Sequence, residues 1–163
     1  MKRTIYIAGG CFWGVEHYYK SLKGVLNTEV GYANGNKANP SYEEVKTHVT
    51  NHAETLKLEY DDEIISLEKI LEHFLRFVDP YSIDQQGEDR GHQYRSGIYF
   101  VNPDERQIIK DYLSINIKGK YNIEVLPLDN FYDAEEYHQD YLYKNPNGYC
   151  HINMRLIKDK EKK

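Results

Sequence analysis

The sequence predicts an α+β fold, in which helices form one layer on a mixed β-sheet. Apolar strand patterns and amphipathic helix patterns follow one another in the order strand, helix, strand, and this order occurs twice. That order favours a two-layer sandwich with a split βαβ (ferredoxin-like) core. The 163 residues suit one domain, and no linker rich in Pro, Gly or Ser divides them. We therefore expect a single domain over residues 1–157, long irregular loops, and a charged, solvated tail over residues 158–163.

The first unit of this order begins close to the N-terminus. Residues 4–8 indicate a short apolar strand, and from Val15 onwards apolar side chains recur at i, i+3, i+4 and i+7, which predicts an amphipathic helix. Residues 26–32 predict the second strand, and residues 40–45 a brief helical segment. Alternation of apolar and polar residues over 55–60 indicates a third strand with one buried face.

The second unit begins with the clearest helix of the chain. Ser66 can cap it, an apolar stripe continues to Val78, and Pro80 ends it. A strand over 97–101 follows a polar loop. Asn102 and the proline after it then predict a helix start. The side chains expected on the buried side of that helix are Ile108, Ile109, Tyr112 and Leu113.

Two further elements complete the prediction. Residues 123–128 form the last clear strand. Residues 133–136 resemble a capping box, and we expect a tyrosine-rich helix from there through Tyr143.

Charge and composition exclude several classes of function. Twenty-six acidic and 21 basic side chains give a formal charge of −5 without a basic stripe, which argues against nucleic acid and anionic membranes as partners. No apolar stretch has the length of a membrane span, and the N-terminus lacks a signal-peptide pattern. We expect a cytoplasmic protein that acts as a monomer.

The most informative residue is Cys11, which lies between the first strand and the first helix in the run Gly9-Gly10-Cys11-Phe12-Trp13-Gly14. Unpaired amides at a helix N-terminus favour the thiolate, which is the reactive form of cysteine. A buried structural cysteine is the alternative. A loop tip flanked by glycines rarely buries a side chain. The adjacent aromatic residues indicate an apolar pocket beside the sulfur. We favour a reactive thiol.

A thiolate beside an apolar pocket can attack a disulfide, an acyl group, a peroxide or a sulfoxide. Acyl transfer needs a histidine base, and none of the seven histidines lies in a recognisable acyl-transfer signature. His48 and His52 are four residues apart without an accompanying carboxylate, so we expect no metal site. Cys150 is too distant in sequence for a paired metal motif, which leaves a redox pair with Cys11 open.

Five motifs decide among these chemistries. They occur in the order G-C-F-W-G, P-x-Y-x-x-V, H-A-E, Q-G-x-D-x-G-x-Q-Y-R-S and A-E-x-Y-H-Q-x-Y-L. With them, the chain resembles the peptide methionine sulfoxide reductases of the A type, which act on the S epimer, from about residue 4 to about residue 152. Asn51 departs from the glycine that is usual in the family, and asparagine is the other residue suited to a positive φ.

The resemblance implies a role for each matching residue. Cys11 matches the nucleophile, Glu54 the acid, and Cys150 the resolving cysteine of many members. The hydroxyls that bind the sulfoxide oxygen match Tyr42 and Tyr94, and the walls of the methyl pocket match Phe12 and Trp13. The positions that match residues in or around the family's substrate site are Asp89, His138, Tyr141 and Tyr149.

The implied reaction is reduction of methionine S-sulfoxide, protein-bound or free, to methionine. It leaves a sulfenic acid on Cys11, which condenses with Cys150 to a disulfide. The resemblance implies that thioredoxin then reduces the disulfide, with dithiothreitol as a substitute in vitro, and that no cofactor or metal is needed. The acid must stay uncharged near neutral pH, which burial of Glu54 would achieve. A thiol peroxidase and a catalytically silent module that grips oxidised or apolar peptide side chains are the alternatives.

Overall fold

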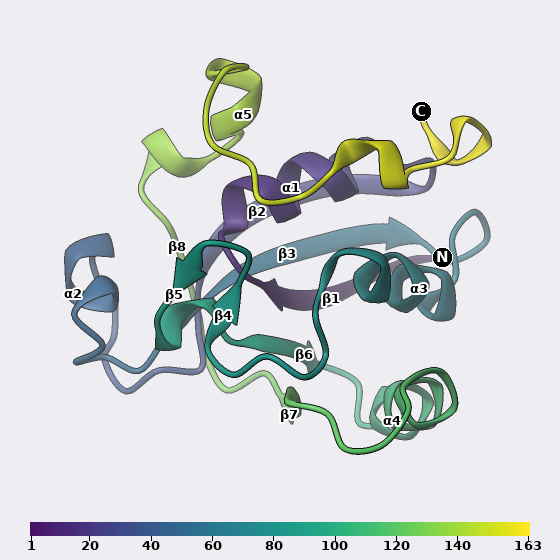
Figure 1. Cartoon of the computed structure of the whole chain (residues 1–163), viewed down its shortest axis with the longest axis horizontal. Helices are drawn as coiled ribbons and strands as arrows, with labels where there is room; N and C mark the ends of the chain where they lie inside the picture. The colour runs from purple at the N-terminus through teal and green to yellow at the C-terminus, as the bar shows by residue number, and fades with distance from the viewer.

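The computed structural model describes the whole chain, residues 1–163, as helices packed on a six-stranded sheet (Figure 1). The strands lie in the order β7-β6-β1-β3-β2-β8. Each of the four central strands runs antiparallel to its neighbours, and their bounds are β1 (Lys2–Gly9), β2 (Val25–Ala33), β3 (Ala53–Asp61) and β6 (Ser96–Phe100). Their order, β6-β1-β3-β2, is that of a split βαβ core. The predicted fold class is therefore confirmed.

Short strands extend this array at both edges. β7 (Ile123–Pro127) pairs parallel with β6, and α4 (Glu105–Asn116) connects the two. β8 (Phe131–Asp133) pairs antiparallel with β2. A separate hairpin joins β4 (Gln85–Gln86) to β5 (Asp89–Arg90) outside the main sheet. The sheet is thus mixed, and the hairpin contributes to the site described below.

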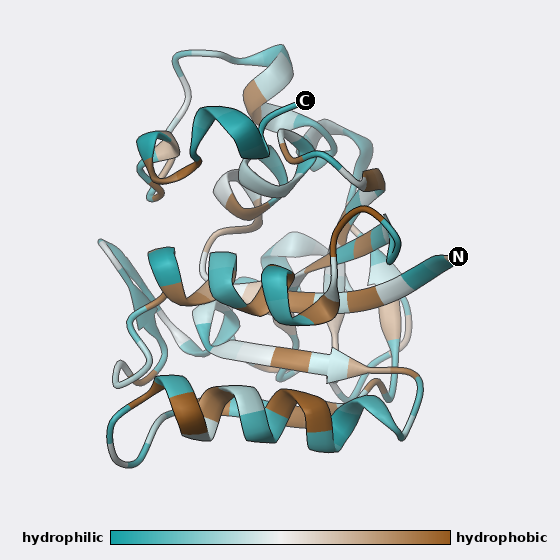
Figure 2. Cartoon of the chain, turned by 90° about the vertical axis from the view of Figure 1, so that its right-hand side faces the viewer, coloured by the Kyte–Doolittle hydropathy of each residue, from teal (hydrophilic) through white to brown (hydrophobic).

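The main core lies between the sheet and the helices α1 (Phe12–Lys20) and α3 (Leu67–Phe77). Successive strand residues face opposite sides, so Ile5 and Ile7 of β1 are fully buried in this core while their strand neighbours pack in a smaller cluster on the other face. Figure 2 shows apolar and polar residues alternating along α3 and α4, as expected of helices that bury one side. None of the helices is both long and apolar enough to span a membrane.

The tyrosine-rich helix predicted over residues 133–143 is not present. The segment instead contains β8, a single 3₁₀ turn at Glu136–His138, and the short helix α5 (Tyr141–Lys144). The Gln139 side chain binds both the N–H and the C=O of Val30 on β2, at 2.9 and 2.8 Å. Asp140 has a left-handed backbone, with φ 52°. These contacts hold the segment against the sheet edge and interrupt any continuous helix.

The helix α4 begins later than predicted, and its buried side is narrower. The Asn102 side chain accepts a hydrogen bond from the Asp104 N–H at 3.0 Å and forms a turn, so that Asp104 becomes the residue before the helix. Ile109 and Leu113 are fully buried as expected, whereas Ile108 is 42% exposed. The prediction for Ile108 was wrong.

The C-terminal residues 158–163 are exposed except at Glu161, through which the segment is anchored to α3. The Glu161 carboxylate is 7% exposed and pairs with Arg76 at 2.7 Å and with Lys69 at 2.9 Å, both on α3. The Lys163 N–H donates to the Ser21 carbonyl at 2.9 Å. Ion pairs from one acidic side chain to two basic residues of α3 are enough to anchor a segment whose composition predicts a solvated tail.

Candidate active site

Cys11 is the residue immediately before α1, at the end of β1, as the sequence predicts. Its side chain is only 6% exposed, so the expectation of an open loop tip was wrong. The flanking glycines do not leave the sulfur exposed, because the C-terminal loop fills the space where their side chains would be. A Cβ on Gly10 would lie 2.9 Å from His151 Nε2, and one on Gly14 would lie 3.1 Å from His151 Nδ1 and 3.2 Å from Cys150 Sγ.

The thiol of Cys11 is protonated at rest. Burial raises the pKa of Cys11 strongly, the charge of Glu54 raises it further, and the backbone N–H of Trp13 lowers it by less. The prediction that the helix N-terminus would favour a resting thiolate therefore fails, because desolvation outweighs the backbone amide. Both cysteines are free.

Glu54 supplies a buried acid beside this thiol. It comes from β3, is 1% exposed, and accepts a hydrogen bond from the Phe12 N–H at its Oε1, over 3.3 Å. Its Oε2 is buried without a partner. Burial raises the pKa of Glu54 to about 8, more than the Phe12 amide lowers it. At neutral pH the carboxyl is uncharged, and Oε2 is the oxygen free to carry its proton.

Two phenols face the same place. The Tyr42 and Tyr94 hydroxyls lie close enough to affect each other's pKa. Burial is the main cause that raises the pKa of both, and the charges of Glu54 and Cys11 raise it further. Tyr42 opens the short helix α2 (Tyr42–Lys46), where Glu135 accepts a hydrogen bond from its backbone N–H at 2.9 Å. Both hydroxyls are therefore neutral donors close to the thiol and the acid.

An aromatic wall lies on the α1 side of the site. Trp13 stacks on Tyr141, with ring centroids 3.7 Å apart and planes 10° from parallel. The Trp13 Nε1–H donates to His138 Nδ1 at 3.0 Å, and the His138 ring lies 5.2 Å from the Phe12 ring and 4.8 Å from the Tyr42 ring. Burial lowers the pKa of His138, so the imidazole is neutral, and its Nε2 has no partner.

The β4–β5 hairpin and the C-terminal loop complete the site. Tyr149 and Asp89 lie close enough to shift each other's pKa, and burial is the main cause that raises the pKa of the Asp89 carboxyl. Asp89 and Cys150 both lie close enough for their charges to raise the pKa of Cys11. The Cys150 Sγ donates to the Ile152 carbonyl at 3.4 Å. Glu54, Asp89 and Cys150 thus lie near Cys11, whereas Tyr141 is linked to the site through its stacked contact with Trp13.

Comparison with known proteins decides what this arrangement belongs to. A family profile described as "Peptide methionine sulfoxide reductase" matches residues 3–163. The chain belongs to the peptide methionine sulfoxide reductase family. It is 54% identical to the peptide methionine sulfoxide reductase MsrA of Ureaplasma urealyticum, over 97% of this chain and 98% of that protein.

Solved structures agree with this assignment. The crystal structure of Mxr1 from Saccharomyces cerevisiae in reduced form superposes with a TM-score of 0.84 at 40% identity, covering 91% of this chain and 88% of that one. The structure of Mxr1 in complex with Trx2 superposes with a TM-score of 0.60 at 29% identity, covering 86% and 84%. The recognition of the A type from sequence motifs is confirmed, and the protein is an oxidoreductase that reduces methionine sulfoxide.

Asn51 has the positive φ expected where the family usually has glycine, at 59°, and its carbonyl accepts from Arg95 at 3.0 Å. The departure from the family pattern therefore keeps the backbone geometry. His151 was missed by the sequence analysis, although it follows Cys150 directly, because nothing local shows that its ring reaches the turn at Cys11.

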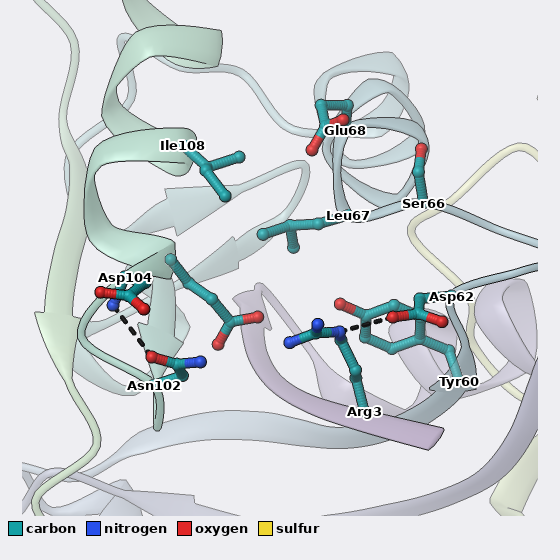
Figure 3. A pocket seen from close by; sticks show the side chains of 10 residues that line it. Arg3, Tyr60, Asp62, Ser66, Leu67, Glu68, Asn102, Asp104 and Ile108 are labelled. Carbon is teal, nitrogen blue, oxygen red and sulfur yellow. Dashed lines mark hydrogen bonds and ion pairs between the residues drawn. The ribbon is translucent and has the colours of Figure 1, made fainter. Parts of the chain in front are cut away.

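The cavity in Figure 3 is separate from this reductase's active site. It measures about 330 Å³ and lies at Arg3 and Tyr60, near the start of β1 and the end of β3, whereas Cys11 follows the end of β1. No residue that lines it belongs to the site around Cys11. No group of three or more His, Cys, Asp or Glu side chains is placed to hold a metal ion.

Proposed function

We propose that this reductase transfers the oxygen of methionine S-sulfoxide, protein-bound or free, to the Cys11 sulfur. The sulfur–oxygen bond of the sulfoxide breaks, a sulfur–oxygen bond forms on Cys11, and the products are methionine and a sulfenic acid. The observation that carries the proposal is the uncharged Glu54 carboxyl beside a buried thiol, with an Oε2 that has no partner in the protein.

The proton balance follows from these groups. A sulfoxide oxygen is a poor leaving group until it is protonated, and Glu54 Oε2 is the proton donor. The Tyr42 and Tyr94 hydroxyls donate hydrogen bonds to the same oxygen as charge develops on it. The Cys11 thiol gives up its own proton as its sulfur attacks, and that proton restores the Glu54 acid.

The aromatic wall positions the substrate. Phe12 and Trp13 contact the sulfur-bound methyl group, since aromatic rings pair favourably with sulfur and small apolar groups. Tyr141 supports Trp13 from behind through its stacked ring. His138, Asp89 and Tyr149 surround the polar part of the bound methionine sulfoxide.

Cys150 then resolves the sulfenic acid. Its thiol displaces the oxygen of Cys11 as water, which forms a disulfide, and thioredoxin reduces this disulfide by dithiol exchange. The position of Cys150 Sγ against the first turn of α1 supports the first step. The complex of the relative Mxr1 with Trx2 supports the second. A reduced thioredoxin pool is consistent with action in the cytoplasm.

A chiral assay with Cys150→Ser tests this sequence of steps. With dithiothreitol, we expect the wild-type enzyme to convert the S epimer to methionine through many turnovers and to leave the R epimer unchanged. Cys150→Ser should release one methionine per chain and then stop when thioredoxin is the only reductant. Multiple turnovers of this variant with thioredoxin would remove Cys150 from the mechanism. Oxidation of the thiols by peroxide, without turnover of the S epimer, would refute the proposed activity.

A further inference from the structure

The imidazole of His151 occupies a slot that the two glycines around Cys11 leave open. Its side chain is 2% exposed. A Cβ on Gly10 would lie 2.9 Å from His151 Nε2 and would displace the ring, and one on Gly14 would lie 3.1 Å from Nδ1 and would crowd it. A basic group is thus buried against the turn that carries Cys11, and it has no role in the reaction steps proposed above.

The hydrogen bonds of His151 define which nitrogen carries its proton. Nε2 lies 2.9 Å from the Gly9 carbonyl oxygen, which can only accept, so Nε2 holds the hydrogen. Nδ1 therefore presents a lone pair. That nitrogen is buried without a hydrogen-bond partner, and the Asp89 carboxylate lies 3.9 Å from it.

Cys150 is the group that needs this lone pair. Its Sγ and His151 Nδ1 both lie within about 3.2 Å of the point where a Cβ on Gly14 would be. In the reduced enzyme the thiol donates to the Ile152 carbonyl, so it turns away from that carbonyl to give its proton to Nδ1. Its thiol is half-buried, and desolvation raises its pKa above the ordinary value of 9. A thiol must lose its proton to attack another sulfur. Without a neighbouring base, very little of the Cys150 thiol would be ionised at neutral pH. A base that takes its proton therefore speeds its attack on the Cys11 sulfur.

We propose that His151 is the general base that removes the proton of Cys150 when this thiol resolves the sulfenic acid on Cys11; the inference rests on the proposed function. Nδ1 takes the thiol proton as the Cys150 sulfur attacks the Cys11 sulfur. The sulfur–oxygen bond on Cys11 breaks, the disulfide forms, and the oxygen leaves as water with the proton passed on from His151. The net change is one sulfenic acid and one thiol to one disulfide and one water.

The groups that face His151 allow this role. Asp89 on the hairpin stabilises the transient imidazolium through Nδ1, and the Gly9 carbonyl keeps Nε2–H in place. The other titratable groups nearby are Tyr149, Cys150 and Cys11. Burial lowers the pKa of His151 below its ordinary 6.5, and the hydrogen bond to the Gly9 carbonyl and then the charge of Asp89 offset this only in part. The base form of His151 therefore prevails at neutral pH.

The test separates resolution of the sulfenic acid from its formation. The reduced enzyme is mixed with one equivalent of methionine S-sulfoxide and increasing dimedone, which traps sulfenic acids. The concentration that traps half of the protein then measures resolution, whatever the rate of the first step. His151→Gln keeps a donor for the Gly9 carbonyl but removes the basic nitrogen. We expect the half-trapping concentration to fall at least tenfold, since general bases commonly contribute about 10²-fold or more.

Three controls make the outcome specific. His73→Gln changes an equally buried histidine on α3 outside the site, and it should leave the trapping curve unchanged. Cys150→Ser, which cannot form the disulfide, calibrates the trap at each pH. In the wild-type enzyme, the rate of resolution should fall at acidic pH as His151 becomes protonated. In His151→Gln, the rate should rise only at alkaline pH, where the Cys150 thiol loses its proton without a neighbouring base.

Each result decides a different claim. Unchanged trapping by His151→Gln, with methionine still released at the wild-type rate, would overturn the role of His151 alone. A wild-type resolution rate without an acidic limb would also overturn it, even if the variant did not fold. No release of methionine by the wild-type enzyme would refute the proposed function and this inference together.

Discussion

Replacement of Glu54 by glutamine is expected to make the protein more stable at neutral and alkaline pH while it slows the first chemical step. The Glu54 side chain is buried, its Oε1 accepts the Phe12 N–H, and its Oε2 has no partner. Glutamine has nearly the same shape, and its Oε1 can accept the same hydrogen bond. Unlike the carboxyl, it never acquires a charge in this environment.

The magnitude follows from the shift in the pKa of Glu54. The change from an ordinary 4.5 to about 8 corresponds to about 5 kcal/mol between the two protonation states. Because the folded-state pKa is raised, the stability of the wild-type protein is complete below the unfolded value of 4.5 and decreases as the pH rises to about 8. The stability of Glu54→Gln relative to wild type should therefore grow by about 3 kcal/mol up to pH 7 and level off above pH 8.

Urea unfolding at pH 5, 7 and 9, followed by the fluorescence of the single tryptophan, measures this difference. Glu63→Gln, at a carboxyl that is 82% exposed, is the matched control and should show no such trend. In single-turnover assays below pH 8, Glu54→Gln should release methionine about 10² to 10⁴ times more slowly, and the ratio should shrink at higher pH, where the wild-type acid also loses its proton. A stability difference that is constant from pH 5 to pH 9 would refute a buried, uncharged carboxyl.

Three further changes have expected outcomes. Gly14→Ala places a methyl group 3.1 Å from His151 Nδ1 and should lower the free energy of unfolding in urea by about 1 to 3 kcal/mol. Disulfide formation should slow more than methionine release. Equal slowing of both steps would contradict the placement of His151 against Gly14. Glu161→Ala leaves two α3 cations without their partner and should cost about 2 kcal/mol. Its pairing lowers the folded-state pKa of Glu161, so this contribution should be complete above pH 4.5 and decline progressively as the pH falls from there towards the lower folded-state pKa. A cost of Glu161→Ala that does not decline at all below pH 4.5 would contradict an ionic role. Tyr141→Ala removes the ring behind Trp13 and should raise the KM for the sulfoxide about five- to tenfold with little change in kcat, and an unchanged KM would deny the stack a role in binding.

The central sheet was predictable because each strand and helix there carries its own periodic pattern. The errors lie where tertiary contacts override local sequence. Residues 133–143 have helical propensity, but Gln139 binds the backbone of β2 and the chain turns at Asp140 instead. The tail 158–163 is charged by composition, yet Glu161 docks on α3 because its cations come from a segment more than 80 residues earlier.

The residues of the site were found through motifs, while their electrostatics required coordinates. The H-A-E motif places Glu54 at the start of a strand, but only its burial gives the acid an uncharged form at neutral pH. The opposite holds for Cys11, where the helix N-terminus predicted a thiolate and burial reversed the outcome. His151 was not predictable, since 142 residues separate it from the carbonyl of Gly9 that it binds.

The concealment of Cys11 has a consequence for survival of the enzyme under oxidative stress. Hydrogen peroxide can oxidise an ionised, accessible thiol to sulfinic or sulfonic acid, which a dithiol does not reduce. Cys11 is 6% exposed and burial raises its pKa, so we expect its sulfur to react slowly with hydrogen peroxide. Burial thereby protects the Cys11 sulfur from oxidation until methionine sulfoxide binds.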